Sequence, residues 1–182
     1  QFSGVSSTQL GSLFTTQIGA LSLVAIDSMS TGQLSGMTSS QIATLATSAI
    51  SGLTSSDITA MTTVQLAGLT SSQITNLTLN SVKGITSTEL SALTTDQMAG
   101  LTSTAIGALT TTALRGLTTA EILTLTTTQM TGLTSAEIAV LTTAQLAPLT
   151  SSQFAALTTS AVAGLNSVDI AALATSQLIG LT

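Results

Sequence analysis

Residues 133–148, LTSAEIAVLTTAQLAP, contain two copies of an eight-residue pattern that decides the fold of the chain. From Val5 to Gly180 the sequence divides into 22 such octads without an insertion, with the consensus L-T-[ST]-x-Q-[IL]-x-[AG]. The first and sixth residues are apolar in all 22 octads. Because a short, unbroken period is typical of repeat architectures, these two positions predict a continuous core formed by stacked octads.

A period of sixteen residues is superimposed on the octads. The eighth position is Gly in every second octad from residue 36 to residue 180, and Pro148 is the one interruption. The octads between them end in Ala, Thr, Asn or Val. This alternation predicts that two octads in different environments form one structural unit of sixteen residues.

The polar positions of the octad are typical of a very short helix. Ser, Thr or Asn occupies the second position in 19 of the 22 octads, and Gln or Glu occupies the fifth position in 14. This S/T-x-x-E/Q spacing is a capping box, and the apolar first and sixth positions are those of a hydrophobic staple. Gly at the eighth position is expected to be the left-handed residue that ends the helix. The small seventh and eighth residues are expected to let neighbouring backbones approach closely.

The sequence accordingly predicts an all-α solenoid of very short helices, with the 8-residue repeat paired into 16-residue coils. Helices of this length are not stable alone, so stacking must stabilise them. The alternative is a β-solenoid. The first and sixth residues are separated by five and then three positions, so in one continuous strand they would lie on opposite faces, and a β-solenoid therefore needs a turn within each octad. Residues 1–182 form a single repeat domain in this interpretation. Octads in 1–35 are less regular and are a candidate docking segment, whereas 36–182 contains the regular 16-residue coils.

Composition excludes several classes of function. The 182 residues include two Lys or Arg, seven Asp or Glu, no His and no Cys. Without imidazole or thiolate groups, we expect no enzyme, no catalytic or cofactor-binding residue, no metal site and no cofactor. Two cations are too few to neutralise the phosphates of a nucleic acid. The longest nearly apolar stretch, 19–26, is too short to insert across a membrane.

The few charged residues fit helix ends. Five acids share the fifth position of their octads, namely Asp57, Glu89, Glu121, Glu137 and Asp169. Stacked in multiples of sixteen residues they would form one column, but no loop of converging oxygen ligands accompanies them, so the capping box explains them better than a Ca²⁺ site. Lys83 and Arg115 each precede a Gly, where a cation complements a helix C-terminus. The other two acids, Asp27 and Asp96, are isolated.

The runs GLTSAEIAVLTTAQLAPLT (132–150) and GLTSSQI (68–74) resemble the tandem LTTxQ[IL]xxL repeats of large secreted or cell-surface bacterial proteins. The resemblance covers nearly the whole chain. It implies a bacterial source, an extracellular or cell-surface location and a structural or adhesive role, and it carries over no catalytic residue.

These observations together predict a structural subunit or segment of an extracellular polymer, such as a filament, tube, sheath or surface layer. Its partners would be copies of itself, joined through uncapped solenoid ends and neutral flanks rich in Ser, Thr and Ala. A net charge of −5 offers weak repulsion between such copies.

Two other functions remain open from the sequence. The repeats could form the stalk or the binding face of a surface adhesin, whose partner would be a surface carbohydrate or another surface protein. An ice- or crystal-binding protein is less favoured, because the adjacent Thr pairs fit poorly to a flat Thr-x-Thr lattice.

Overall fold

The computed structural model describes residues 4–181. Internal contacts divide the chain into two units. The first extends through Ile85 and includes Ala92–Gly100, so it contains α1 to α10 and α12. The second comprises Thr86–Ser91 and the chain from Leu101 onward, so it contains α11 and α13 to α22. Each unit has the same internal architecture.

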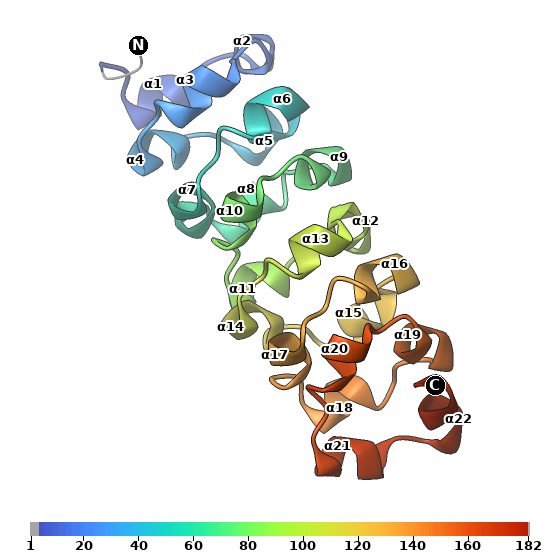
Figure 1. The fold of residues 1–182 in the computed structure, drawn as a ribbon. Helices are drawn as coiled ribbons and strands as arrows, with labels where there is room; N and C mark the ends of the chain where they lie inside the picture. The colour runs from blue at the N-terminus through green and yellow to red at the C-terminus, as the bar shows by residue number, and fades with distance from the viewer. Residues whose placement is uncertain (1–3, 182) are drawn as a thin grey trace. The chain divides into compact units, whose positions relative to one another are not determined.

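Helices of four to six residues follow one another, one in each octad (Figure 1). No β-strand occurs within residues 4–181, and the prediction of an all-α solenoid is therefore confirmed. The helices are α1 Ser7–Gly11, α2 Thr15–Gly19, α3 Leu23–Asp27, α4 Thr31–Leu34, α5 Ser39–Thr44, α6 Thr47–Ile50, α7 Ser55–Ala60, α8 Thr63–Leu66, α9 Ser71–Thr75, α10 Leu79–Val82, α11 Ser87–Leu90, α12 Thr95–Gly100, α13 Ser103–Ile106, α14 Thr111–Leu114, α15 Thr119–Thr124, α16 Thr127–Met130, α17 Ser135–Ile138, α18 Thr143–Leu146, α19 Ser151–Ala155, α20 Thr159–Val162, α21 Ser167–Ala172 and α22 Thr175–Ile179.

The stacking partner of each helix is the helix three places along the chain. In the first unit α1 packs on α4, α2 on α5, α3 on α6 and α9 on α12. In the second unit α11 packs on α14, α13 on α16, α17 on α20 and α19 on α22. One coil thus contains three octads instead of the expected two. The capping signals are local to one octad, so they do not specify how many octads complete a coil.

The core consists of the two apolar columns predicted from the octads. In the interior coils the first and sixth residues are buried, and Ile42, Leu53 and Phe154 are at most 2 % exposed. The sixth residue lies in the C-terminal half of the helix, and the first residue of the next octad lies in the link that follows. Three short helices per coil therefore turn both columns inward, and each coil buries the apolar surface of the next.

The glycines at the eighth position allow two coils to touch through their backbones. None of the glycines in the described part has a positive φ, so the expectation of a left-handed helix end is wrong. A Cβ added to Gly100 would instead lie 2.5 Å from the carbonyl oxygen of Ser71, the first residue of α9. A contact that short forces the backbone to move. Gly is required here for close approach, as the sequence suggested, and not for its conformational freedom.

The same pairing recurs through both units, where each Gly approaches the first helical residue of the octad three places earlier. Gly36, Gly68 and Gly84 approach Ser7, Ser39 and Ser55 in the first unit. In the second unit the corresponding pairs are Gly116 with Ser87, Gly132 with Ser103, Gly164 with Ser135 and Gly180 with Ser151. The first helical residue is small wherever a Gly lies against it, with Leu23 opposite Gly52 as the exception.

Replacing Gly100 by Ala should lower the free energy of unfolding by about 1–3 kcal/mol, because the new methyl group overpacks the contact with Ser71. Gly32 lies in α4, and a Cβ there would meet nothing closer than 3.9 Å. Gly32→Ala is therefore the matched control and should stabilise by about 0.5–1 kcal/mol through helix propensity. Urea unfolding followed by circular dichroism measures both. Equal effects of the two substitutions would contradict the close-contact explanation.

Candidate functional site

The capping box predicted for the octads is present at most of the helix N-termini, as α5 illustrates. The Thr38 hydroxyl accepts a hydrogen bond from the Gln41 backbone N–H at 3.2 Å. In return, the Thr38 backbone N–H donates to Oε1 of Gln41 at 2.8 Å. Two of the four N–H groups that a helix start leaves without an intrahelical partner are thus satisfied.

The second half of the same glutamine amide contacts the preceding coil. Nε2 of Gln41 donates to the carbonyl oxygen of Leu10, at the end of α1, at 3.0 Å. It also donates to the carbonyl oxygen of Leu13, in the link after α1, at 2.8 Å. Gln41 is only 3 % exposed. One buried side chain therefore satisfies the start of its own helix and carbonyl groups in the neighbouring coil.

This arrangement repeats along both units and forms a ladder of glutamines, which are buried except for the half-buried Gln33. The carbonyl that accepts from each glutamine belongs to the first residue of an octad, 28 positions earlier, at 2.7–2.8 Å in most cases and 2.6 Å for the last pair. The pairs are Gln33 with Val5, Gln41 with Leu13, Gln65 with Met37, Gln73 with Leu45, Gln97 with Leu69, Gln129 with Leu101, Gln145 with Leu117, Gln153 with Leu125, and Gln177 with Leu149.

The sequence pattern revealed only half of the hydrogen bonds of the glutamine ladder. The capping box explains why the fifth residue must accept a hydrogen bond, and Glu accepts as well as Gln. The preference of Gln over Glu at this position, 11 octads against three, is the signal that a donor is needed too. The ladder supplies that reason, because carbonyl oxygens of the neighbouring coil accept from the amide.

The acids at the fifth position keep the cap but lack the donor. Oε2 of Glu137 accepts from the Thr134 backbone N–H at 2.6 Å. Its other oxygen, Oε1, is buried without a hydrogen-bond partner among the described residues. Desolvation by burial raises the pKa of Glu137 above its ordinary value, although the hydrogen bonds from Thr134 oppose this shift.

The other four acids of this set also occupy capping boxes, at α7, α11, α15 and α21. They do not form the single expected column, because residues two or four octads apart fall in different columns of a three-octad coil. Asp169 has a further partner, since the Thr143 hydroxyl donates to its Oδ1 at 2.9 Å. Within residues 4–181 no group of three or more acids lies close enough to hold a metal ion.

The remaining charged residues are separate from this ladder. Lys83 is the C-cap residue of α10 and Arg115 is that of α14, which are the helix ends expected from the sequence. Asp27 ends α3, and Asp96 lies in the first turn of α12.

The irregular N-terminal octads retain the fold with weaker caps. Phe14 is the N-cap residue of α2 and has no side-chain acceptor, so only its backbone N–H bonds to Oε1 of Gln17, at 2.9 Å. The Phe14 side chain is 76 % exposed. In the apolar run 21–26, Ile26 is buried and Val24 is 71 % exposed. This part of the chain therefore presents more apolar surface than the interior octads do.

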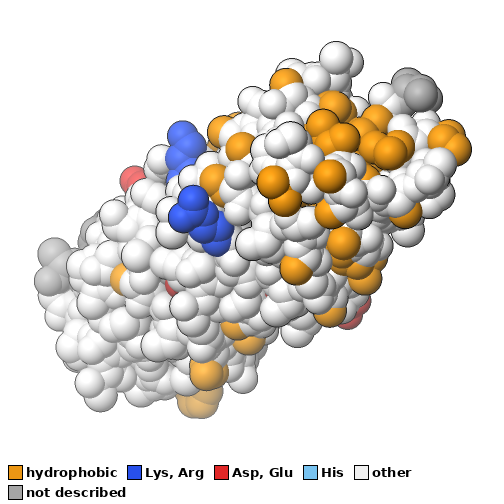
Figure 2. Space-filling view, turned by 90° about the horizontal axis from the view of Figure 1, so that it is seen from below, with side chains coloured by type: hydrophobic (Ala, Val, Ile, Leu, Met, Phe, Trp, Pro, Cys, Tyr) orange, Lys and Arg blue, Asp and Glu red, His pale blue; other side chains and the backbone are white. Residues whose placement is uncertain are grey.

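The surface between stacked octads is polar but mainly uncharged. Figure 2 shows few charged side chains on the face drawn and an area where hydrophobic side chains gather. One open groove of about 480 Å³ is lined by Thr31, Ser55, Ser56, Thr59 and Lys83, together with small residues. No helix in the part described is long and apolar enough to cross a membrane. Hydroxyl groups and small side chains thus dominate what a partner would meet.

The chain resembles one known repeat family over part of its length. A family model described as the ALTTAQ repeat matches residues 130–159. The matched segment contains Gln145 and Gln153, two members of the ladder. No curated protein and no solved structure matches the chain. The similarity supports a repeat region at residues 130–159.

Replacing Gln73 by Glu should lower the free energy of unfolding by about 1–3 kcal/mol, because carbonyl groups of Ile42 and Leu45 lose a buried donor while the cap is kept. Gln9→Glu is the control, since the exposed Gln9 caps α1 but its amide nitrogen has no partner in residues 4–181. We expect almost no change in the control. Urea unfolding of dilute protein compares the variants, and a similar loss in both would argue against the ladder.

Replacing Glu137 by Gln should stabilise the protein at pH 7, because the amide can donate where Oε1 now has no partner. The raised pKa in the folded state means that the folded protein binds the proton more tightly than the unfolded chain. The penalty from Glu137 is therefore absent below the ordinary Glu pKa and grows as pH rises through the folded pKa. The advantage of Glu137→Gln should shrink toward pH 4, as measured by thermal unfolding across pH. An advantage independent of pH would contradict this account.

Proposed function

We propose that this protein is a structural subunit or segment of an extracellular polymer, built by association of copies of the same chain. The observation that carries the proposal is the self-complementary coil. One side of an interior coil presents apolar sixth residues and carbonyl groups, and the other side presents apolar first residues and, in most coils, glutamine amides. Such a surface fits another copy of the same repeat better than it fits an unrelated ligand.

The flanks of the coils support the same proposal. Nine charged residues in 182, with a net charge of −5, give weak electrostatic repulsion between neighbouring molecules. Exposed Ser, Thr and Ala side chains are short, so they lose little conformational entropy when surfaces pack together. Lateral contact between copies is therefore less costly than contact between surfaces rich in Lys and Glu.

The finer features of the proposal come from the sequence pattern. A bacterial source and a location outside the cell or on its surface are those of the proteins that the repeats resemble. The absence of His and Cys agrees with a role that needs no chemical reaction. A filament, tube, sheath and surface layer are alternative symmetries of one self-association.

Purified chain should form ordered assemblies as its concentration rises, visible by negative-stain electron microscopy and by sedimentation velocity. Since few charges are involved, raising the salt concentration from about 0.05 to 0.5 M should change assembly little, in contrast with an interface held by ion pairs. A chain that stays monomeric at high concentration under all salt conditions would disprove the proposal.

A further inference from the structure

The two cations of the chain occupy equivalent places in their octads. Lys83 and Arg115 are each the seventh residue, directly before a Gly, and both side chains are exposed. Most other octads have a small residue at this position. Neither the ammonium of Lys83 nor the guanidinium of Arg115 has a hydrogen-bond or ion-pair partner among residues 4–181. Both charged groups are therefore available to a ligand.

Each cation also lies beside an octad rich in hydroxyl groups. The helix that Lys83 caps, α10, packs on α7, and the helix that Arg115 caps, α14, packs on α11. The octads of α7 and α11 have hydroxyl residues at their third, fourth and seventh positions, a combination found in five of the 22 octads. These residues are Ser55, Ser56 and Thr59 beside Lys83, and Ser87, Thr88 and Ser91 beside Arg115.

In the first unit these groups line the open groove of about 480 Å³. The Thr59 hydroxyl lies at 2.9 Å from the carbonyl oxygens of both Ser55 and Gly84, so it joins the two coils that form the walls. The hydroxyls of Thr31, Ser55 and Ser56 make no hydrogen bond within the described residues. The groove thus offers one ammonium group and three hydroxyls that can bind a ligand.

The carboxylate in the same octad does not line this groove. Asp57 is only 5 % exposed, and its Oδ2 accepts from the backbone N–H of Thr54 at 2.8 Å and from the Thr54 hydroxyl at 2.7 Å. The acid is therefore used by the helix cap. The groove presents a positive charge although the chain as a whole carries −5.

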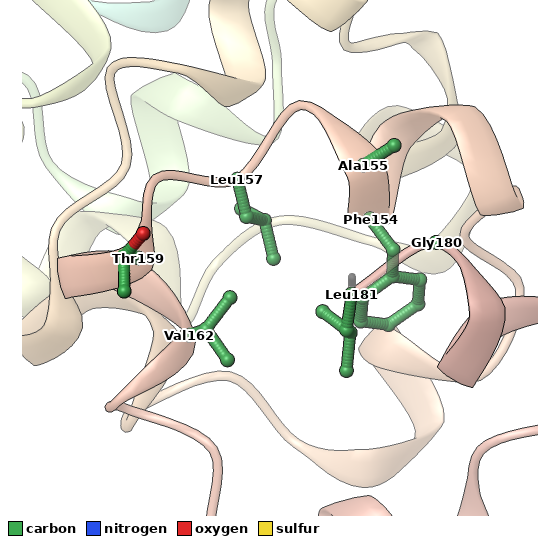
Figure 3. A pocket seen from close by; sticks show the side chains of 7 residues that line it. All are labelled: Phe154, Ala155, Leu157, Thr159, Val162, Gly180 and Leu181. Carbon is green, nitrogen blue, oxygen red and sulfur yellow. The ribbon is translucent and has the colours of Figure 1, made fainter.

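Other hollows of the structure lack these groups. An equivalent groove of about 410 Å³ lies between α5 and α8, where Ala43 and Ala67 hold the places of Thr59 and Lys83. The pocket of about 130 Å³ in Figure 3 is lined mainly by apolar side chains such as Phe154, and no charged residue is among the described residues that line it. The groove is thus a feature of the repeat, whereas its charge and its hydroxyls belong to particular octads.

We propose that the groove at Lys83 binds a carboxylated sugar unit of an acidic polysaccharide, and that the groups around Arg115 form a second site of the same kind. The cation pairs with the carboxylate, and the free hydroxyls exchange hydrogen bonds with those of the sugar, because a hydroxyl both donates and accepts. One exposed ion pair contributes little, so each site is weak alone. A polysaccharide that engages several sites gains affinity by avidity. The inference does not depend on self-association of the chain.

The lining of the groove favours a sugar over an acidic peptide. Its residues are Ser, Thr, Ala, Gly and Lys, so no aromatic or large apolar side chain contributes. The apolar side chains of a peptide would therefore find no apolar surface to pack on, whereas the hydroxyls of a sugar ring find polar partners. The volume of the groove is within the range of about 300–1,000 Å³ that is usual for ligand pockets.

A pair of variants separates this site from a general effect of charge. Lys83→Gln with Arg115→Gln removes both cations. The relocated variant carries these two changes together with Ala120→Lys and Val168→Lys, so its net charge is again −5. Both new positions are exposed, and the seventh residue of neither octad has a hydroxyl. Circular dichroism verifies that each variant is folded.

The measurement is surface plasmon resonance of dilute protein on three immobilised polymers. Polygalacturonate has carboxylates and sugar hydroxyls, dextran has the hydroxyls alone, and polyglutamate has the carboxylates alone. We expect the unmodified chain to bind polygalacturonate best and about 0.5 M salt to weaken this binding. The apparent Kd should rise at least about tenfold in the double variant and in the relocated variant, because both lose the charged hydrogen bond.

Three results would overturn the inference. They are an unmodified chain that does not bind polygalacturonate, a relocated variant that binds as the unmodified chain does, and polyglutamate or dextran bound as tightly as polygalacturonate. Selective binding by a chain that stays monomeric would support this site while it contradicts the proposed polymer.

Discussion

The buried glutamine of the octad is the interaction on which the rest of the structure depends. Helices of four to six residues leave most of their backbone N–H and C=O groups without intrahelical partners, and burial of such groups without a hydrogen bond is costly. Gln73 illustrates the solution, since its oxygen serves the start of α9 and its nitrogen serves the carbonyls of Ile42 and Leu45. A chain made mostly of helix ends can therefore still enclose an apolar core.

The number of octads in a coil decides which residues face each other across the stack. The sequence alternates between octads that end in Gly and octads whose helix begins with Ser. A coil of three octads places every octad on one of the other kind, because three is an odd number. The small residues consequently meet each other at the points of backbone contact, as Gly100 meets Ser71. With two octads in a coil, octads of the same kind would stack, and each Gly would face the bulkier Thr or, for Gly100, Leu79.

Much of this architecture could be predicted from the sequence, because caps, staples and apolar columns are local to one octad. Thr38 and Gln41 bond as their spacing indicates, and the five acids at the fifth position are caps. The coil length could not be predicted from such local patterns. The information lies in a correlation between octads three places apart. Pro148 is the one interruption in the series of Gly, and in the octad three places earlier Thr119 replaces the usual Ser. The second bond of the glutamine was missed for the same reason, as its acceptors lie in another coil.

The mismatch between a sequence period of two octads and a coil of three octads constrains how such genes change in length. Insertion of one octad reverses the alternation of everything that follows, so each later Gly loses its Ser and faces Thr. Insertion of two octads moves the later helices to another of the three helix positions in a coil, but each Gly again faces an octad of the other kind. The order of the two kinds of octad is thereby kept. Duplications and deletions are therefore tolerated in pairs of octads, as insertions in a reading frame are tolerated in whole codons, even though no structural element has that length.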